Sequence, residues 1–144
     1  MFRENIEIET LGGMSFVDIT DKIVSVVKKS DIKDGLCSIF LPATTAGLLI
    51  NENEIMLMED FKKLFSVVDE KRMYNHPDNA FSHMRALLAA TEKTMPVENG
   101  NLVLGKLQKI LLAEFDTGPR KRSVIVTLIG DEKKDKKKDK SQQE

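Results

Sequence analysis

The order of strand-like and helix-like segments constrains the fold of this chain more than any other feature. Two strand-like segments precede a helix, two more precede a pair of helices, and the remaining strand-like segments close the chain. A parallel α/β sheet requires strands that alternate one by one with helices, and this order does not. We therefore predict a single-domain α+β fold with a mixed, mostly antiparallel sheet and about three helices.

Hydrophobic periodicity predicts the individual elements. Alternating apolar and polar residues indicate strands, whereas apolar residues three or four positions apart indicate helices. The predicted strands are 6–9, 15–18, 36–41, 47–50, 94–97, 102–104, 107–115 and 123–129, and the predicted helices are 20–29, 54–68 and about 78–90.

Turn and cap residues connect these elements. Gly12-Gly13 predicts a hairpin between the first two strands, and Thr20 is the predicted cap of the first helix. Asp34-Gly35 predicts a turn before the next two apolar strands, which we expect to pair. Asn99-Gly100 is the strongest short hairpin signal in the chain.

The two later helices are predicted to bury one apolar face each. In the helix at 54–68, apolar residues from Ile55 to Phe65 recur on one side, and Met56 and Met58 are expected to fill the core rather than bind a cofactor. The last helix is expected to turn its larger apolar residues toward one face, which would hold Ala80, His83, Met84, Leu87 and Leu88.

Composition narrows the setting and the partners. The net charge is −1, so no global field attracts nucleic acid or an anionic membrane. The first residues contain no apolar signal-peptide core, and no run of about 18 apolar residues predicts a membrane span. Cys37 is the only cysteine and lies in an apolar run, which predicts a buried thiol and a cytoplasmic protein.

The C-terminal segment differs from the rest of the chain. We divide the chain into a domain at 1–130 and a charged, flexible tail at 131–144, which holds six lysines and five acidic residues and no apolar side chain. Nucleic-acid binding by this tail is the alternative to a solvated role. The net charge of the tail is only +1, which argues against a nucleic-acid partner.

Polar residues next to apolar strands mark the candidate site. Thr44-Thr45 and Asn51-Glu52-Asn53 flank an apolar strand, an arrangement that suits a ligand pocket with a few placed polar groups. Strand-ending and helix-capping turns use the same residue types, so a purely structural role remains open. Gln108 and Glu114 share parity, which in a regular strand places them on one face, at a cavity mouth or on an edge.

Charged residues and histidines supply further candidates. Arg120 and Arg122 share a strand face, and paired guanidiniums can bind phosphate, although a surface salt bridge is the alternative. His76 and His83 are the only histidines, and their spacing is not that of a helical metal pair. A histidine such as His83 on an apolar helix face is more commonly a hydrogen-bonded core residue.

Four motifs in order resemble the YjbQ-like family over about residues 5–130. The motifs are Phe40 to Leu48 with Asn51-Glu52-Asn53; His76, Asp78-Asn79 and His83; Asn99 to Gly105 with Gln108; and Glu114-Phe115-Asp116 with Gly118 to Arg122. Members of this family are described as secondary thiamine-phosphate synthases. The resemblance implies a trimeric α/β domain that joins a pyrimidine diphosphate to a thiazole phosphate.

The resemblance also implies roles for individual residues. It places His83, Glu114 and His76 as proton-transfer groups, and His76 and His83 also as ligands of a divalent metal, zinc or magnesium. Substrate would be bound by Thr44, Thr45, Asn51, Asn53, Asn79, Gln108, Arg120 and Arg122, with the two arginines holding the diphosphate.

Two departures from the family pattern open an alternative function. The family has a histidine directly before the paired threonines, where this chain has Ala43, and it has Gly-Thr-Trp-Gln where this chain has Gly105-Lys106-Leu107-Gln108. The alternative is therefore a non-catalytic oligomeric protein that binds a ligand or a partner at a degenerate family site.

Overall fold

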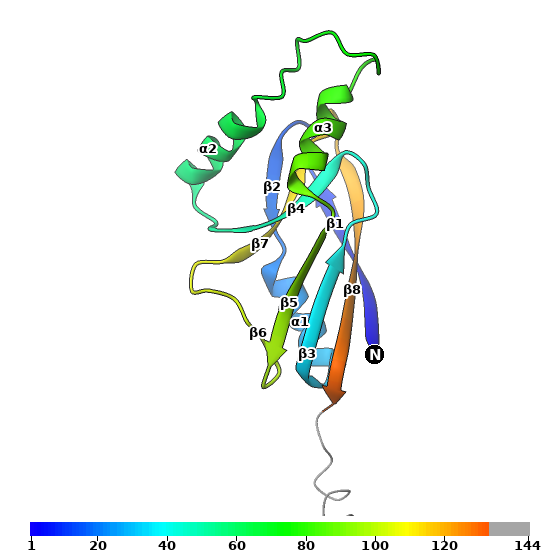
Figure 1. Cartoon of the computed structure of the whole chain (residues 1–144), viewed down its shortest axis with the longest axis vertical. Helices are drawn as coiled ribbons and strands as arrows, with labels where there is room; N and C mark the ends of the chain where they lie inside the picture. The colour runs from blue at the N-terminus through cyan, green and yellow to red at the C-terminus, as the bar shows by residue number, and fades with distance from the viewer. Residues whose placement is uncertain (133–144) are drawn as a thin grey trace, which may run out of the picture.

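The computed structural model describes residues 1–132 and shows two antiparallel sheets with three helices (Figure 1). The strands are β1 (Phe2–Thr10), β2 (Ser15–Asp18), β3 (Ile32–Phe40), β4 (Ala46–Asn51), β5 (Glu92–Glu98), β6 (Asn101–Leu102), β7 (Lys109–Glu114) and β8 (Arg120–Glu132). The helices are α1 (Thr20–Ser30), α2 (Ile55–Phe65) and α3 (Ala80–Ala89). This arrangement confirms the predicted α+β class.

The strands divide into a larger and a smaller sheet. The five-stranded sheet has the order β1-β8-β3-β5-β6, and the three-stranded sheet has the order β2-β7-β4. Every pairing between described strands is antiparallel. The main core forms where Ile23, Val26 and Val27 of α1 pack against apolar residues of the larger sheet such as Cys37 and Leu128.

Two of the predicted strand pairings are wrong. β1 and β2 do not form a hairpin, because β1 pairs with β8 in the larger sheet and β2 pairs with β7 in the smaller one. β3 and β4 also lie in different sheets. Asp34-Gly35 is not a turn between elements but lies inside β3, beside an irregularity in its pairing with β8. Turn residues in the sequence indicate where a strand ends, but they do not determine which distant strand it pairs with.

The predicted cap of α1 is also wrong. Thr20 is the first residue of the helix, and its backbone N–H and hydroxyl both donate to Oδ1 of Asp18, at 3.0 and 2.6 Å. The Thr20 hydroxyl in turn accepts the N–H of Ile110 at 2.8 Å. Burial raises the pKa of Asp18, but hydrogen bonds from Thr20 and Asn53, together with Lys109, hold that pKa below its ordinary value.

The hairpin at Asn99-Gly100 is confirmed. β5 pairs with β6 directly across it, and both turn residues have positive φ, 51° for Asn99 and 77° for Gly100. A two-residue turn of this kind requires positive φ at both positions, which asparagine and glycine tolerate best. Here a local signal was sufficient because both partners of the pairing are sequence neighbours.

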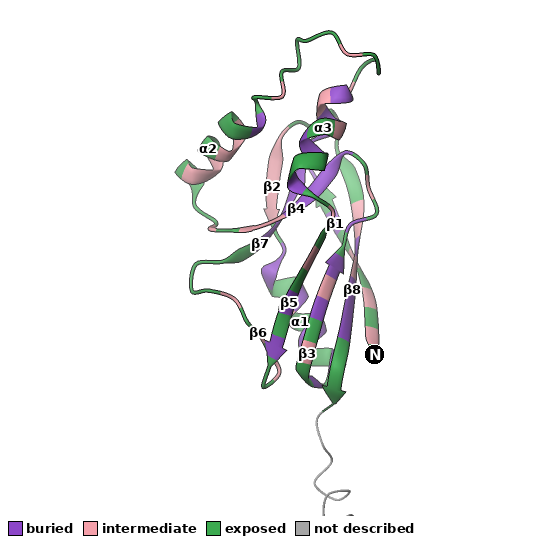
Figure 2. Cartoon of the chain, viewed as in Figure 1, coloured by how far each residue is buried: buried purple, intermediate pink, exposed green. Residues whose placement is uncertain are grey.

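Helix α2 forms as predicted but is mostly exposed. Glu54 caps it by accepting the N–H groups of Met56 and Leu57 at 3.0 and 2.7 Å. Only Phe65 is buried, and Figure 2 shows exposed and intermediate residues along most of the helix. Met56 is 76% exposed, so the prediction that it fills the core is wrong.

Apart from Ala80, which is buried as predicted, helix α3 buries the face opposite to the predicted one. Its buried residues are Ala80, Ser82, Arg85, Ala86 and Ala89, whereas Met84, Leu87 and Leu88 are exposed. The reason is close packing against β4, because a Cβ added to Gly47 would lie 2.6 Å from the Cβ of Ala89. Only small side chains fit at such an approach, so the larger apolar residues face away.

Cys37 is fully buried, as predicted, and burial raises the pKa of its thiol to about 12.

β8 continues through Asp131 and Glu132, which the sequence had assigned to the tail. The remainder of that predicted tail, 133–144, lies outside the described residues. Among the helices that the structure describes, none has the length and hydropathy needed to cross a membrane.

Replacing Gly47 with alanine should destabilise the protein by about 1–3 kcal/mol, because the new methyl group forces α3 away from β4. The matched control is Gly105→Ala, where the nearest atom is the flexible end of Gln108 at 3.2 Å. Urea unfolding of both variants measures the effect. Equal stability of the two variants would contradict the close packing of α3 on β4.

Candidate functional site

A largely buried network of charged and hydroxyl side chains connects the two sheets. We call it the arginine–carboxylate cluster; its members are Thr10, Thr45, Glu114, Asp116, Arg120 and Arg122. They come from β1, β7 and β8 and from the segments next to β4 and β7. The antiparallel register that pairs Ala46 with Glu114 brings these distant parts of the chain together.

The centre of the cluster is a two-point ion pair. Arg122 donates from Nε to Oε1 of Glu114 at 2.9 Å and from Nη2 to Oε2 at 2.6 Å. The Glu114 side chain is 0% exposed and the Arg122 side chain 12% exposed. Glu114 also accepts the Thr10 hydroxyl at 2.6 Å and the Asp116 N–H at 3.2 Å. Both of its oxygens are therefore engaged, which suits a structural carboxylate better than a proton-transfer group.

Asp116 forms the second ion pair of the cluster. Its Oδ2 lies 3.2 Å from Nη2 of Arg120 and accepts the Thr45 hydroxyl at 3.0 Å. Its Oδ1 accepts the Thr117 N–H at 2.7 Å. Burial raises the pKa of Asp116, but these hydrogen bonds and the Arg120 charge hold that pKa below its ordinary value.

Both arginines that the sequence nominated for a diphosphate are paired with carboxylates. Arg120 is 47% exposed on its side chain and corresponds to the surface salt bridge that the sequence left open. The Arg122 pair is buried instead, and Nη2 of Arg122 also donates to the Thr45 hydroxyl at 2.8 Å. The cluster contains two guanidinium and two carboxylate groups, so its charges balance without a bound anion.

Two adjoining cavities of about 330 and 530 Å³ lie beside α3. They share His83 and Met84, and we call them together the histidine groove. The smaller cavity is lined by Tyr74, Asn75, His76, Ala80, His83 and Met84, and the larger by Ala43, Thr44, His83, Met84, Ala86, Leu87, Ala90 and Thr91. Three nominated residues, Thr44, His76 and His83, therefore line one groove.

The two histidines face each other in this groove. Their ring centroids are 5.1 Å apart with an interplanar angle of 87°, and Nε2 of His76 lies 3.2 Å from Oδ1 of Asn79. His83 is half-buried at the wall of both cavities rather than enclosed in the core. Within residues 1–132, no group of three histidine, cysteine or acidic side chains could hold a metal ion.

The remaining nominated residues lie at the far end of β4. Asn51 and Gln108 line a separate cavity of about 440 Å³, and Asn53 donates to Oδ2 of Asp18 at 2.9 Å. Asn51 lies six residues after Thr45 along an extended strand, a span of ~20 Å. Gln108 precedes β7 and accepts the Gly105 N–H at 2.7 Å, so the expected common face with Glu114 is wrong.

Sequence reasoning missed three residues that complete these sites. Thr10 and Asp116 join the arginine–carboxylate cluster, and Tyr74 lines the histidine groove. Asp116 had a usable signal, because it follows Glu114 by two residues just before a Gly-Pro turn. Thr10 and Tyr74 had none, since their places depend on strand register and on the path of a long connection.

Comparisons with known proteins agree on a family. A family model described as UPF0047 protein YjbQ-like matches residues 4–131. A UPF0047 protein of Archaeoglobus fulgidus is 38% identical over an alignment that covers 86% of this chain and 98% of the relative. A solved structure of a YbjQ-like protein of unknown function from Sulfolobus solfataricus is 34% identical, with a TM-score of 0.83 and coverage of 90% of this chain and 99% of that one.

A hypothetical protein from Aeropyrum pernix gives a TM-score of 0.87 at 29% identity, covering 91% of this chain and 100% of that one. The likeness thus extends over nearly the whole length of each relative, in sequence and in fold alike.

Replacing Arg122 with methionine should cost about 3–5 kcal/mol of unfolding free energy, because Glu114 is then buried without its cation. Arg120→Met should cost less than about 1 kcal/mol, because that ion pair is partly exposed. Denaturant unfolding at neutral pH measures both. If the two variants lost the same stability, the Glu114–Arg122 pair would not be the centre of the cluster.

Proposed function

The chain belongs to the YjbQ-like family, UPF0047, and from this premise we propose that it binds a small phosphorylated heterocycle in the histidine groove. We further propose that a weak transferase activity of the thiamine-phosphate synthase type takes place there. In that reaction a thiazole nitrogen bonds to the methylene carbon of a pyrimidine while the bond from that carbon to diphosphate breaks.

One observation carries the proposal: Thr44 and His83 line the same cavity, and His76 lies across from His83. The rest of the wall is largely apolar and includes Met84 and Leu87. A planar heterocycle fits such a wall, while a few polar groups orient it. The groove therefore offers both parts of a small-ligand site.

The departing diphosphate needs hydrogen-bond donors that meet its developing negative charge. The imidazole N–H groups of His83 and His76 and the hydroxyl of Thr44 are among the donors that line the groove. We assign His83 the principal role because it borders both cavities. Asn79 supports His76 through the contact to its Nε2.

The arginine–carboxylate cluster supports the groove from behind in this proposal. Arg122 and Asp116 hold the hydroxyl of Thr45, and the preceding residue, Thr44, lines the groove. Arg120, Asn51, Asn53 and Gln108 lie outside the groove of the same chain. Their part in substrate binding therefore depends on a second copy.

We propose that the protein assembles as a homotrimer. Supporting this, large apolar residues on α2, on α3 and just after α2 are exposed, among them Ile55, Met56, Leu64, Val67, Leu87 and Leu88. Leu87 alone is 80% exposed. Apolar groups of this kind on a monomer mark an association surface.

A non-catalytic ligand-binding protein is the second candidate. Ala43 lines the groove at the position where family members have a histidine. Without that imidazole the groove keeps its shape and its apolar wall but has one fewer donor for the leaving group. In this second candidate, the groove binds its ligand without turnover.

We also propose a cytoplasmic setting and no nucleic-acid partner. The single cysteine, Cys37, is free and buried, which fits a reducing compartment in which no disulfide is needed. The net charge of −1 gives nucleic acid no general attraction to this chain.

Incubation with hydroxymethylpyrimidine diphosphate and thiazole phosphate should yield thiamine phosphate above a boiled control. His83→Ala should lower kcat/KM by at least about tenfold, because it removes a donor from the reacting groove. Lys29→Ala, on α1 and away from the groove, is the control and should leave the rate unchanged.

Calorimetry with thiazole phosphate separates the two candidates. Binding without turnover favours the non-catalytic protein, and the absence of both overturns the proposed function.

Native mass spectrometry should show three times the chain mass of 16.2 kDa. Leu88→Asp should release monomers, because it places a charge on the apolar surface of α3. Leu11→Asp, at an exposed loop residue outside both helices, should leave the trimer intact. A monomeric wild-type protein at micromolar concentration would contradict the assembly.

A further inference from the structure

Arg85 is a buried cation on the inward face of α3, and neither the cluster nor the groove contains it. Its side chain is only 3% exposed. It donates from Nε to the carbonyl of Phe65 at 3.1 Å, from Nη2 to the carbonyl of Val68 at 2.8 Å, and from Nη1 to Glu70 at 3.1 Å. All three nitrogens therefore bind the end of α2 and the residues that follow it.

The chemistry of these partners explains why an arginine stands here. The last carbonyls of a helix have no partner within the helix, and a planar guanidinium can reach several of them at once. A buried cation is costly unless it is fully bonded. Phe81 adds a further stabilising contact, since its ring centroid lies 5.2 Å from the guanidinium carbon.

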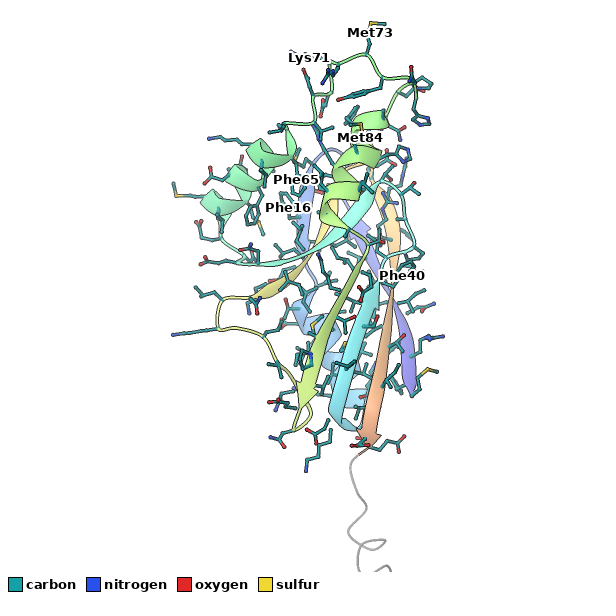
Figure 3. All side chains as sticks on the ribbon, in the orientation of Figure 1. Phe16, Phe40, Phe65, Lys71, Met73 and Met84 are labelled. Carbon is teal, nitrogen blue, oxygen red and sulfur yellow. The ribbon has the colours of Figure 1, made fainter. Side chains whose placement is uncertain are left out.

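Helix α2 has few other attachments to the body of the protein. Phe61 and Phe65 approach Phe16 of β2, with ring centroids 6.1 and 6.5 Å apart, and Phe65 also packs on Phe115 at 4.7 Å. Figure 3 shows Phe65 and Phe16 between α2 and the smaller sheet. Arg85 thus provides the polar half of the anchor at the C-terminal end of α2.

The segment that Arg85 anchors leads directly to the histidine groove. The connection 66–79 runs from α2 over the end of the molecule to α3 (Figure 1), and Lys71 and Met73 lie at its outer tip (Figure 3). The hydroxyl of Tyr74 donates to the carbonyl of Asp69 at 2.8 Å. This hydrogen bond links the two sides of the outer tip. His76 follows Tyr74 by two residues. The chain therefore reaches His76 from the part of the connection that Arg85 binds, at Val68 and Glu70.

We propose that Arg85 is a positioning residue for the histidine groove: it holds the connection 66–79 so that His76 stays opposite His83. The consequence for ligand binding rests on the proposed function, whereas the placement of His76 does not. Glu70 contributes less than the two carbonyls, because its side chain is 60% exposed and its pairing is screened by solvent.

Nuclear magnetic resonance tests this directly, because the chain has only two histidines and their ring signals are readily assigned. In the wild type, the rings of His76 and His83 should give a mutual nuclear Overhauser effect. Arg85→Met should abolish it and shift the His76 signals. Hydrogen exchange of residues 66–79 should become at least tenfold faster, with exchange in β3 and β8 unchanged.

The controls separate positioning from general stability. Arg3→Met removes an exposed arginine on β1 and should change neither readout. Arg85→Lys keeps a cation with fewer directed donors and should give an intermediate exchange rate. If Arg85→Met does not fold, the same measurements on Arg85→Lys decide. An intact ring contact together with unchanged exchange in a folded Arg85 variant overturns the proposal, as does uniform acceleration across β3 and β8.

Titration with thiazole phosphate adds the functional readout. The dissociation constant should rise about tenfold in Arg85→Met relative to Arg3→Met. Absence of binding to the wild type would refute the proposed function but leave the positioning role standing, because the ring contact and the exchange rates are measured without ligand.

Discussion

The buried ion pair between Glu114 and Arg122 joins the two sheets, and the rest of the structure depends on this junction. Glu114 belongs to β7 of the smaller sheet, Arg122 belongs to β8 of the larger one, and Thr10 adds the end of β1. Two largely buried charges are tolerated only when each is well bonded, and here the carboxylate accepts hydrogen bonds from four donors. The ion pair therefore fixes the position of the two sheets relative to each other. A catalytic role for Glu114 would compete with this structural role.

The groove follows from this junction through a series of short contacts. The cluster holds Thr45, which leaves Thr44 facing the groove at the start of β4. Gly47, which lies two residues after Thr45, allows α3 to approach β4 closely and so determines the position of His83 on α3. Arg85 on the same helix binds the end of α2 and the connection that carries His76. In the proposed function, these buried polar groups position the half-buried His83 and the exposed His76 for a ligand.

Local signals in the sequence predicted the elements well and their partners poorly. The alternation of apolar and polar residues in β1, the spacing of apolar residues in α1 and the Asn99-Gly100 turn all depend on residues close in sequence. These signals therefore do not depend on the long-range arrangement of the chain. The separation of β3 from β4 depends on pairing across long stretches of chain. The face of α3 was wrong because close packing on Gly47 favoured alanine over leucine. For the candidate site, Thr44, His83, Glu114 and Arg122 were all nominated from the sequence, but only the strand register shows that they fall into two separate groups, Thr44 with His83 and Glu114 with Arg122.

A crystal structure with thiazole phosphate and inorganic diphosphate bound tests the central claim most directly, because it locates the ligand. The account predicts density in the histidine groove, with hydrogen bonds of ~3 Å from Thr44 and His83 to the ligand, and an unchanged ion pair between Glu114 and Arg122. Ligand bound to Arg120 and Arg122 with their carboxylates displaced, or bound beside Asn51 and Gln108 with the groove empty, would contradict it.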